Sequence, residues 1–238
     1  MANKFDGNVV LVAGGTGGLG RAVSLAFLDE SARVVVTYRS EKEFSALKQS
    51  IGAQTSPSGY QVDVTDEAAV GRLVNDILAA GGRLDVMVNA VGAYAGGTAL
   101  WQTDPAVFER MMALNLRSGY VLSKHVVPQM LKQGSGSIVS VSSRAAVDHA
   151  AGAAAYAASK AASVALFDSL AADLKGTGVR VNSVLPSVID TDANRKAMPD
   201  ADFSKWPKPE DIAKVIIFLC SEDAKLIHGA SVPVYGVF

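Results

Sequence analysis

The sequence predicts an α/β fold in which helices cover both faces of a mainly parallel, seven-stranded sheet. Short valine-rich runs alternate along the chain with longer segments of helical periodicity, which is the pattern of repeated βαβ units. The short runs are largely apolar, as expected for strands that are covered on both faces. A chain of 238 residues is long enough to bury a sizeable core, and we expect residues 1–238 to form a single domain.

In the first half of the chain, each expected strand is a short apolar run and each expected helix carries apolar residues at helical spacing. The third strand has the weakest signal. The expected elements are, in order, strand 9–13, helix 18–29, strand 33–38, helix 42–51, strand 59–62, helix 67–80 and strand 84–89.

The second half continues this alternation but contains one segment without a clear pattern. Residues 187–207 are polar and irregular, and structured elements flank them, so we expect a loop or lid over a site there. The expected elements are a long helix 105–131, strand 137–141, an alanine-rich helix through Tyr156 to about residue 175, strand 179–184, helix 210–221 and strand 231–234.

The charge balance favours small molecules as partners. The chain has 22 basic and 23 acidic residues, and this balance gives no electrostatic attraction to nucleic acid or to an anionic membrane. The single cysteine, Cys220, excludes an intrachain disulfide framework and provides no thiolate cluster for a metal. Neither a signal-peptide pattern nor an apolar run long enough for a bilayer is visible, so we expect a cytoplasmic protein.

A glycine-rich segment, residues 13–20, lies between the first strand and the first helix. Gly14 would permit a tight turn, Gly18 would let the backbone approach phosphates, and Gly20 would let the helix pack closely. The helix N-terminus offers free N–H groups to an anion. The segment predicts a doubly wound Rossmann fold that holds a dinucleotide pyrophosphate, with a flexible glycine loop as the alternative. The residues expected to bind it are Gly14, Thr16, Gly17, Gly18, Leu19 and Gly20.

Tyr156 and Lys160 are four residues apart in the alanine-rich helix and therefore project from one face. A nearby ammonium lowers the pKa of a phenol, which can then exchange a proton with a carbonyl or alcohol oxygen. Ser142 and Ser143 end the preceding strand, at the sheet edge where α/β sites form. A hydroxyl there could bond the reacting oxygen. The alternative is a packing tyrosine, a solvated lysine and serines in an ordinary turn.

The glycine spacing and the Ser, Tyr, Lys set resemble the short-chain dehydrogenase/reductase family over nearly the whole chain. The glycine motif of that family is T-G-x-x-x-G-x-G, and Ala13 replaces its threonine, which removes a hydroxyl that would tie the turn to neighbouring backbone. Ser143, thirteen positions before Tyr156, matches the family's serine. Asn115 matches an asparagine that in this family bends a helix and holds a water joining the lysine to solvent. A polar helix residue that bonds its own backbone is the alternative for Asn115.

Further matches follow the outline of the family's cofactor. Residues 63–64 fall where the family contacts the adenine. Residues 89–92 resemble its N-N-A-G segment, although only the first and last match outright. Residues 186–191 resemble its P-G-x-x-x-T segment at the nicotinamide amide, with Ser187 in place of glycine. The cofactor contacts implied in this way are Asp63, Val64, Asn89, Ala90, Val91, Pro186, Val188 and Thr191, together with Tyr156 and Lys160.

The resemblance implies an oxidoreductase that moves a hydride between a nicotinamide cofactor and a carbonyl or secondary alcohol, without a metal. Tyr156 would act as general acid or base, and Lys160 would lower its pKa and hold the ribose. Ser143 would orient the substrate oxygen, and Asn115 would maintain the proton relay. A regulatory protein that binds NAD(P) on the same fold with little turnover is the alternative, and the intact Ser, Tyr and Lys argue against it.

The end of the second strand predicts which nicotinamide cofactor is bound. An acidic residue at this place would favour NAD(H). Tyr38 stands there instead, and Arg39 follows with a charge suited to a 2′-phosphate, before Ser40. We therefore expect NADP(H), with NAD(H) as the alternative because loop geometry can redirect a side chain.

The sequence says less about the identity of the substrate and about the oligomeric state. Segments 91–101, 144–152 and 187–207 would set the substrate, which could be an acyl-carrier substrate, a steroid, a sugar or a xenobiotic ketone. The helix 152–170 is apolar on more than one face, which predicts a homo-oligomer. The family resemblance implies a dimer or a tetramer. Side chains that could line a substrate pocket, or cover the core or a subunit contact, are Tyr94, Trp101, His149 and Trp206.

Overall fold

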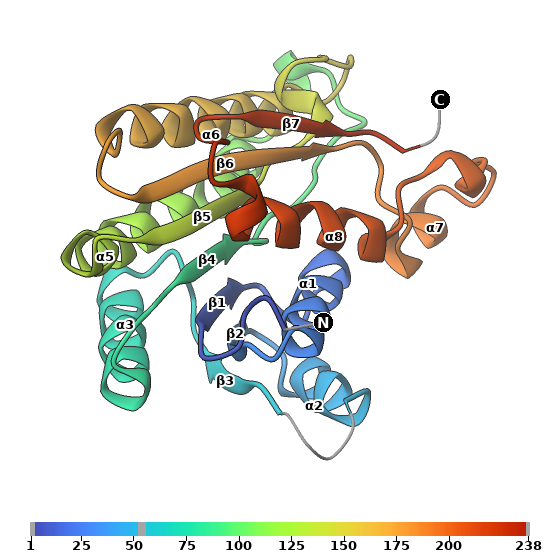
Figure 1. Ribbon diagram of the computed structural model, residues 1–238. Coiled ribbons are helices and arrows are strands. Elements are labelled where there is room, and N and C mark those ends of the chain that lie inside the picture. Colours follow the sequence, from blue (N-terminus) through green and yellow to red (C-terminus); the bar gives the residue numbers. More distant parts are fainter. Residues whose placement is uncertain (1–2, 52–55, 237–238) are drawn as a thin grey trace.

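Most strands of this protein are short runs rich in β-branched residues, and all strands join one sheet (Figure 1). The computed structural model describes residues 3–51 and 56–236. Within these residues the strand order is β3-β2-β1-β4-β5-β6-β7 and every neighbouring pair is parallel, which confirms the predicted sheet. The strands are β1 (Val9–Ala13), β2 (Arg33–Tyr38), β3 (Ser58–Gln61), β4 (Val86–Asn89), β5 (Gly136–Val141), β6 (Val179–Pro186) and β7 (Ser231–Val234).

Helices cover both faces of the sheet, which confirms the doubly wound arrangement (Figure 1). Successive side chains of a strand point to opposite faces, so each strand contributes to two cores. Val10 and Val12 of β1 belong to one hydrophobic core, and Leu11 belongs to the other. The first core includes α1 (Gly18–Asp29), α2 (Glu41–Gln49) and α8 (Pro209–Cys220), and the second includes α3 (Glu67–Gly81), α5 (Ser118–Gln133) and α6 (Ala154–Asp173).

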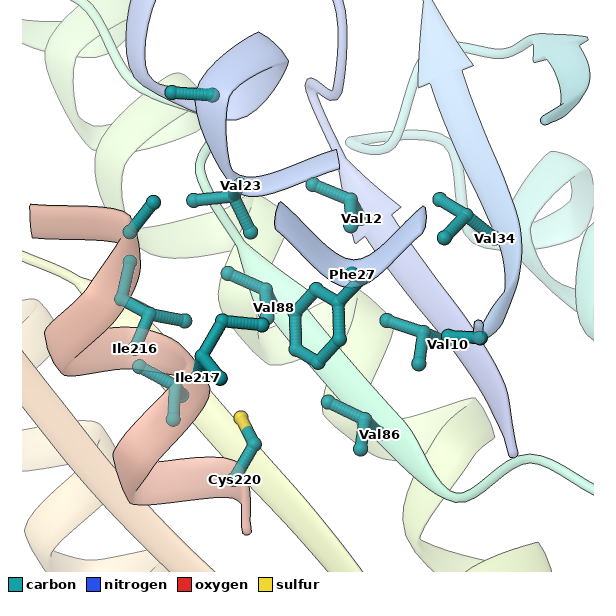
Figure 2. Close-up of a cluster of buried hydrophobic side chains, with 14 of the residues drawn as sticks. Val10, Val12, Val23, Phe27, Val34, Val86, Val88, Ile216, Ile217 and Cys220 are labelled. Atoms are coloured by element: carbon teal, nitrogen blue, oxygen red, sulfur yellow. The ribbon is translucent and has the colours of Figure 1, made fainter. Parts of the chain in front are cut away.

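The first core is organised around Phe27 of α1, whose ring lies between valines of the central strands and the residues of α8 (Figure 2). Phe27 is fully buried, and burial of such a side chain contributes about 1.5–3 kcal/mol. Cys220 lies in this core as a free thiol, and burial raises its pKa to about 12. A thiol in this environment is unreactive.

The long helix expected over residues 105–131 is interrupted in the structure. It consists of α4 (Pro105–Met112), a π-helical turn η2 (Ala113–Arg117) and then α5. The interruption lies at Asn115, whose buried side chain bonds the backbone of Ala93, outside the helix. A π-turn accommodates a side chain held in this way, and such turns are frequent at functional sites.

The segment 187–207 is more regular than the sequence indicates. It contains the helix α7 (Asp192–Ala197) and the short helix η4 (Phe203–Lys205). The hydroxyl of Thr191 caps α7 by accepting a hydrogen bond from the N–H of Asn194 at 3.2 Å, and this bond satisfies one of the free donors at the helix start. The sequence analysis missed both helices, because segments this short show no recognisable helical periodicity.

Three short 3-10 helices complete the secondary structure of the described residues: η1 (Leu100–Gln102), η3 (Arg144–Ala146) and η5 (Glu222–Ala224). The strand expected from residue 84 begins two residues later, because the side chain of Gln133 bonds both backbone groups of Leu84. No helix in the described part of the chain is long and apolar enough to cross a membrane. The expected cytoplasmic location stays a prediction.

Candidate active site

A groove opens beyond the carboxyl ends of β1, β2 and β4, where the strand order changes direction. Ligands of open α/β sheets bind at such a point. The groove contains nine of the residues that the sequence analysis selected: Gly14, Thr16, Gly17, Tyr38, Arg39, Asp63, Val64, Ala90 and Val91. Lining residues that it did not select as binding residues are Thr37, Glu43, Val62, Gly92 and Leu114.

The glycine-rich turn has the geometry that its sequence predicts. Gly14 has φ +73°, a backbone conformation that favours glycine. A Cβ atom at Gly20 would lie 2.0 Å from the carbonyl oxygen of Gly14, so only glycine lets the helix fold back onto the turn. A Cβ atom at Gly18 would lie 2.8 Å from the methyl carbon of Thr191. The segment after β6 therefore lies directly against the turn.

The turn fits the pyrophosphate of a dinucleotide. Gly17 is the N-cap of α1 and supplies no side chain to the helix N–H groups, and the first turn of α1 contains no acidic residue. These N–H groups and the positive end of the helix dipole can bind an anion. Leu19 has its side chain in the hydrophobic core, so its contribution would come from the backbone.

Thr37 supplies the hydroxyl that holds the glycine-rich turn, which Ala13 lacks. Its buried hydroxyl oxygen accepts a hydrogen bond from the N–H of Gly14 at 2.9 Å, and its carbonyl accepts one from Gly15 at 3.1 Å. A residue of β2 therefore ties the turn to neighbouring backbone, although Ala13 lacks the hydroxyl. The local sequence around residue 13 carries no sign of this bond, because Thr37 is 23 residues further along the chain.

The outer end of the groove is formed by the end of β2 and the start of α2. The ring of Tyr38 stacks on Phe44 with centroids 4.6 Å apart, and its hydroxyl donates to the carboxylate of Glu41 at 2.6 Å. Arg39 lines the groove, whereas Ser40 caps α2 and its hydroxyl accepts from a backbone N–H. Of these predicted residues, Arg39 is the one with a positive charge to offer to a ligand.

The predicted adenine contacts lie further along the same groove. The carboxylate of Asp63 accepts hydrogen bonds from the N–H and the hydroxyl of Thr65 at 2.9 and 2.7 Å. These bonds, with a smaller contribution from the charge of Arg39, hold the pKa of Asp63 below its ordinary value. The carboxylate is therefore ionised, and both bonds use the Oδ1 atom.

Asn89, at the end of β4, is buried, and its side chain accepts a hydrogen bond from the N–H of Val91 at 3.2 Å. This bond shapes the strand end that forms one wall of the groove. Pro186 is buried at the end of β6, and Val188 is partly exposed just after it. In the protein without a ligand, none of these three residues lines the groove.

Tyr156 lies near the start of α6, half-buried, with Ser143 beside it. Burial raises the pKa of the phenol, the contact with the Ser143 hydroxyl opposes this effect, and Tyr94 adds to it. The ring of Tyr94 meets that of Tyr156 edge-on, with centroids 5.0 Å apart. In the protein without a ligand, Tyr156 is therefore protonated at neutral pH.

Lys160 lies one helical turn after Tyr156 and is buried. Its Nζ atom donates to the carbonyl oxygen of Val141 at 3.0 Å, and desolvation lowers its pKa from 10.5 to about 8. The expected lowering of the Tyr156 pKa by this ammonium is not found: the pKa is raised, mainly by burial, and Lys160 is not among the causes of the shift. The spacing of four residues put both side chains on one face but did not determine their protonation.

A hydrogen-bond network connects Asn115 to the helix that carries Tyr156. The amide nitrogen of Asn115 donates to the hydroxyl of Ser159 at 2.9 Å, and this hydroxyl donates to the carbonyl of Tyr156 at 2.7 Å. A Cβ atom at Gly92 would lie 2.9 Å from Asn115 Oδ1 and 3.2 Å from Lys160 Nζ. Gly92 also lines the groove, so the buried lysine lies just behind this part of the groove wall. Ser159 was not singled out from the sequence, where a serine in an alanine-rich helix carries no distinct signal.

The aromatic residues considered for a substrate pocket are dispersed. Tyr94 is the one that contacts the Ser143, Tyr156 and Lys160 set, through the ring of Tyr156. Trp101, on η1, is 86% exposed, and Trp206 packs on Phe203 with centroids 4.9 Å apart. His149 is exposed, with Nδ1 3.1 Å from the carbonyl oxygen of Ala145.

Comparison with known proteins assigns this site to a family. A family model described as short chain dehydrogenase matches residues 8–202. The chain belongs to the short-chain dehydrogenase family. It is 31% identical to the 3-oxoacyl-acyl-carrier-protein reductase FabG of Thermotoga maritima, over 98% of each chain. It is 32% identical to the meso-2,3-butanediol dehydrogenase of Serratia marcescens, over 98% of this chain and 95% of the relative.

The solved structures of the family give the same result for the fold. The structure of ElxO with NADP bound matches this short-chain dehydrogenase with a TM-score of 0.90 and 29% sequence identity, over 96% of this chain and 97% of the other. The protein is therefore an NAD(P)-dependent short-chain oxidoreductase with the Rossmann-type fold of the family.

Proposed function

We propose that this short-chain dehydrogenase interconverts a carbonyl compound and a secondary alcohol, with NADP(H) as the cofactor. The observation that carries the proposal is that Tyr156 lies beside Ser143, one helical turn before Lys160, and that Lys160 lies close to Gly92 in the lining of the dinucleotide groove. The phenol of Tyr156 is next to the Ser143 hydroxyl, and Gly92 joins the groove to Lys160.

The cofactor, when bound, would supply the hydride acceptor or donor. The turn of residues 14–20 would hold its phosphates, Asp63 and Val64 would contact the adenine, and residues 89–91 with Pro186, Val188 and Thr191 would surround the nicotinamide end. Lys160 would hold the adjacent ribose through its ammonium. Of these residues, the ones that line the groove are Gly14, Thr16, Gly17, Asp63, Val64, Ala90 and Val91. Thr191 lies against the turn at Gly18, and Lys160 lies close to Gly92.

In the reduction, the hydroxyl of Tyr156 would donate its proton to the substrate oxygen as the carbonyl carbon is reduced. Ser143 would donate a hydrogen bond to the same oxygen and orient it. The raised pKa of Tyr156 keeps the phenol protonated for this step. In the oxidation, the phenolate would accept the proton, and Asn115 would support its exchange with solvent through Lys160.

The choice of NADP(H) rests on Arg39. The guanidinium lines the groove at its outer end, and no acidic residue replaces Tyr38 at the end of β2. A guanidinium suits a phosphate dianion, with which it can form charge-assisted hydrogen bonds. The related structure that was solved with NADP bound supports the same choice.

We predict that Arg39→Ala selectively weakens NADPH binding. Loss of a charge-assisted contact costs on the order of 1.5–3 kcal/mol, which corresponds to about tenfold to over a hundredfold in the dissociation constant. NADH has no 2′-phosphate, so its dissociation constant changes little. Titration of both cofactors at fixed salt, with the exposed Arg72→Ala as control, measures the effect. Equal losses for both cofactors would indicate general damage and would contradict the assignment.

The substrate is proposed to be a ketone or the corresponding secondary alcohol. The relatives include a reductase of 3-oxoacyl groups and a dehydrogenase of 2,3-butanediol, which are two directions of the same chemistry. A panel of ketones, aldehydes and secondary alcohols, with NADPH oxidation or NADP reduction as the readout, tests the proposal. Turnover of none of them, together with intact cofactor binding, would favour a regulatory protein instead.

We propose that the protein is a homo-oligomer whose interface includes the outer faces of α5 and α6. A groove on this side is lined by Met112, Leu116, Tyr120 and Leu166, and Tyr120 is 48% exposed. Apolar side chains exposed together often mark a subunit contact. We expect light scattering at micromolar concentration to give a dimer or tetramer, and Tyr120→Glu to give a smaller species. A parent protein that is only monomeric would contradict the proposal.

A further inference from the structure

The outer end of the cofactor groove contains a carboxylate, from Glu43, in addition to the guanidinium of Arg39. Glu43 lies in the first turn of α2, and its side chain reaches back to the glycine-rich turn. There its Oε2 atom accepts a hydrogen bond from the hydroxyl of Thr16 at 3.1 Å. This bond joins the glycine-rich turn to α2, and both residues line the groove.

The other carboxylates near this end are already engaged. Glu41 accepts the hydroxyl of Tyr38, and Asp63 accepts the two bonds from Thr65. The partner of Glu43 is also a neutral hydroxyl, so all three carboxylates keep their charge. Among them, Glu43 is the one that both lines the groove and bonds the glycine-rich turn. In residues 3–51 and 56–236, neither Glu43 nor Arg39 takes part in a salt bridge. The carboxylate charge of Glu43 is therefore not neutralised by a direct partner in this part of the chain.

A 2′-phosphate bound by Arg39 would be placed in a groove that Glu43 also lines. Two anions a few ångströms apart repel each other, and at a site open to water this repulsion changes a dissociation constant by about 5- to 30-fold. A ribose 2′-hydroxyl carries no charge and would not be repelled. The same carboxylate therefore weakens the binding of NADP(H) and leaves the binding of NAD(H) nearly unchanged.

We propose that Glu43 is a specificity-determining residue that weakens NADP(H) binding and brings the affinities for NADP(H) and NAD(H) closer together. Arg39 attracts the phosphate, Glu43 opposes it, and the cofactor preference is the difference between the two effects. This inference rests on the proposed function, because it requires that the adenosine ribose binds at the Arg39 end of the groove.

The test is the variant Glu43→Gln, which keeps the acceptor for Thr16 and removes the charge. We expect its dissociation constant for NADPH to fall about 5- to 30-fold, and that for NADH to change by less than about twofold. The difference between parent and variant should shrink at high salt, because ions screen the repulsion. Binding is measured directly by titration calorimetry, without turnover. Glu222→Gln, on η5 near the amino ends of the central strands and away from the groove, is the control for the same change of net charge.

An unchanged NADPH affinity in Glu43→Gln would overturn the inference, and so would an equal change for both cofactors. These results leave the proposed function intact if Arg39→Ala still weakens NADPH binding selectively. If Arg39→Ala has no selective effect but Glu43→Gln tightens NADPH binding, the Arg39 assignment fails and the role of Glu43 stands. If the parent protein binds neither cofactor, both proposals fail.

Discussion

Replacement of Tyr156 by phenylalanine is expected to lower kcat by about 10²- to 10⁴-fold, the usual contribution of a positioned general acid or base. The variant keeps the ring and its edge-on contact with Tyr94, so the fold and the cofactor dissociation constants should stay close to those of the parent. Steady-state kinetics and cofactor titration separate the two effects. Tyr60→Phe, on β3 at the far edge of the sheet, is a matched control.

The pH dependence of the parent gives a second readout for Tyr156. Because burial raises the pKa of the phenol in the protein without a ligand, the reduction should stay active across neutral pH and decline only at alkaline pH. The oxidation requires the deprotonated group and should increase as pH rises. Near-native turnover of Tyr156→Phe would contradict the general acid role, whatever the pH profile.

Replacement of Lys160 by methionine is expected to remove most activity and, at the same time, to stabilise the protein without a ligand. The pKa of Lys160 is lowered from 10.5 to about 8 by burial, which corresponds to a cost of about 3 kcal/mol for the charged form at pH 7. Loss of the hydrogen bond to Val141 offsets about 1 kcal/mol of this gain. Denaturant unfolding at pH 7 should therefore give a free energy of unfolding that is about 2 kcal/mol higher.

The sign of the pH dependence distinguishes this explanation from a packing effect. Between about pH 8 and pH 10.5 the unfolded chain keeps the Lys160 proton and the folded protein loses it, so the free energy of unfolding of the parent rises with pH in this window. The advantage of Lys160→Met should be complete at pH 7 and disappear toward pH 10.5. Lys175→Met, at an exposed lysine, should show no such trend.

A further readout concerns the cofactor. If the Lys160 ammonium holds the ribose, Lys160→Met should also bind both cofactors more weakly, in spite of its higher stability. Lower stability than the parent at pH 7, or unchanged activity and unchanged cofactor affinity, would contradict the role assigned to this lysine.

Local geometry explains what could be predicted from the sequence. The strand-turn-helix at residues 9–29 is specified by neighbouring residues: only glycine adopts φ +73° at Gly14 without strain and fits against the turn at Gly20. The spacing of Tyr156 and Lys160 follows from the helix itself. These patterns extend over a few residues. They were sufficient to predict the parallel sheet and to place Tyr156 and Lys160 on the same helix face.

Local patterns did not predict two features of the structure. One is the interruption of the expected helix 105–131, and the other is the helix α7 inside residues 187–207. Asn115 bends its helix because its side chain bonds Ala93, 22 residues earlier in the chain. The sequence resemblance suggested a bend at Asn115, but the periodicity of the segment did not. In α7, six residues are too few for a helical pattern to be recognised.

Local patterns in the sequence were enough to predict the layers of the fold and the glycine-rich turn, and to place Tyr156 and Lys160 on one helix face, because each depends on residues close together in the chain. The contacts of Thr37 with the turn next to Ala13, and of Glu43 with Thr16, became visible in the folded protein. The tertiary structure also decided the protonation of the tyrosine and the lysine, since desolvation depends on everything packed around them. These contacts join segments that are distant in the chain, and no local pattern encodes them.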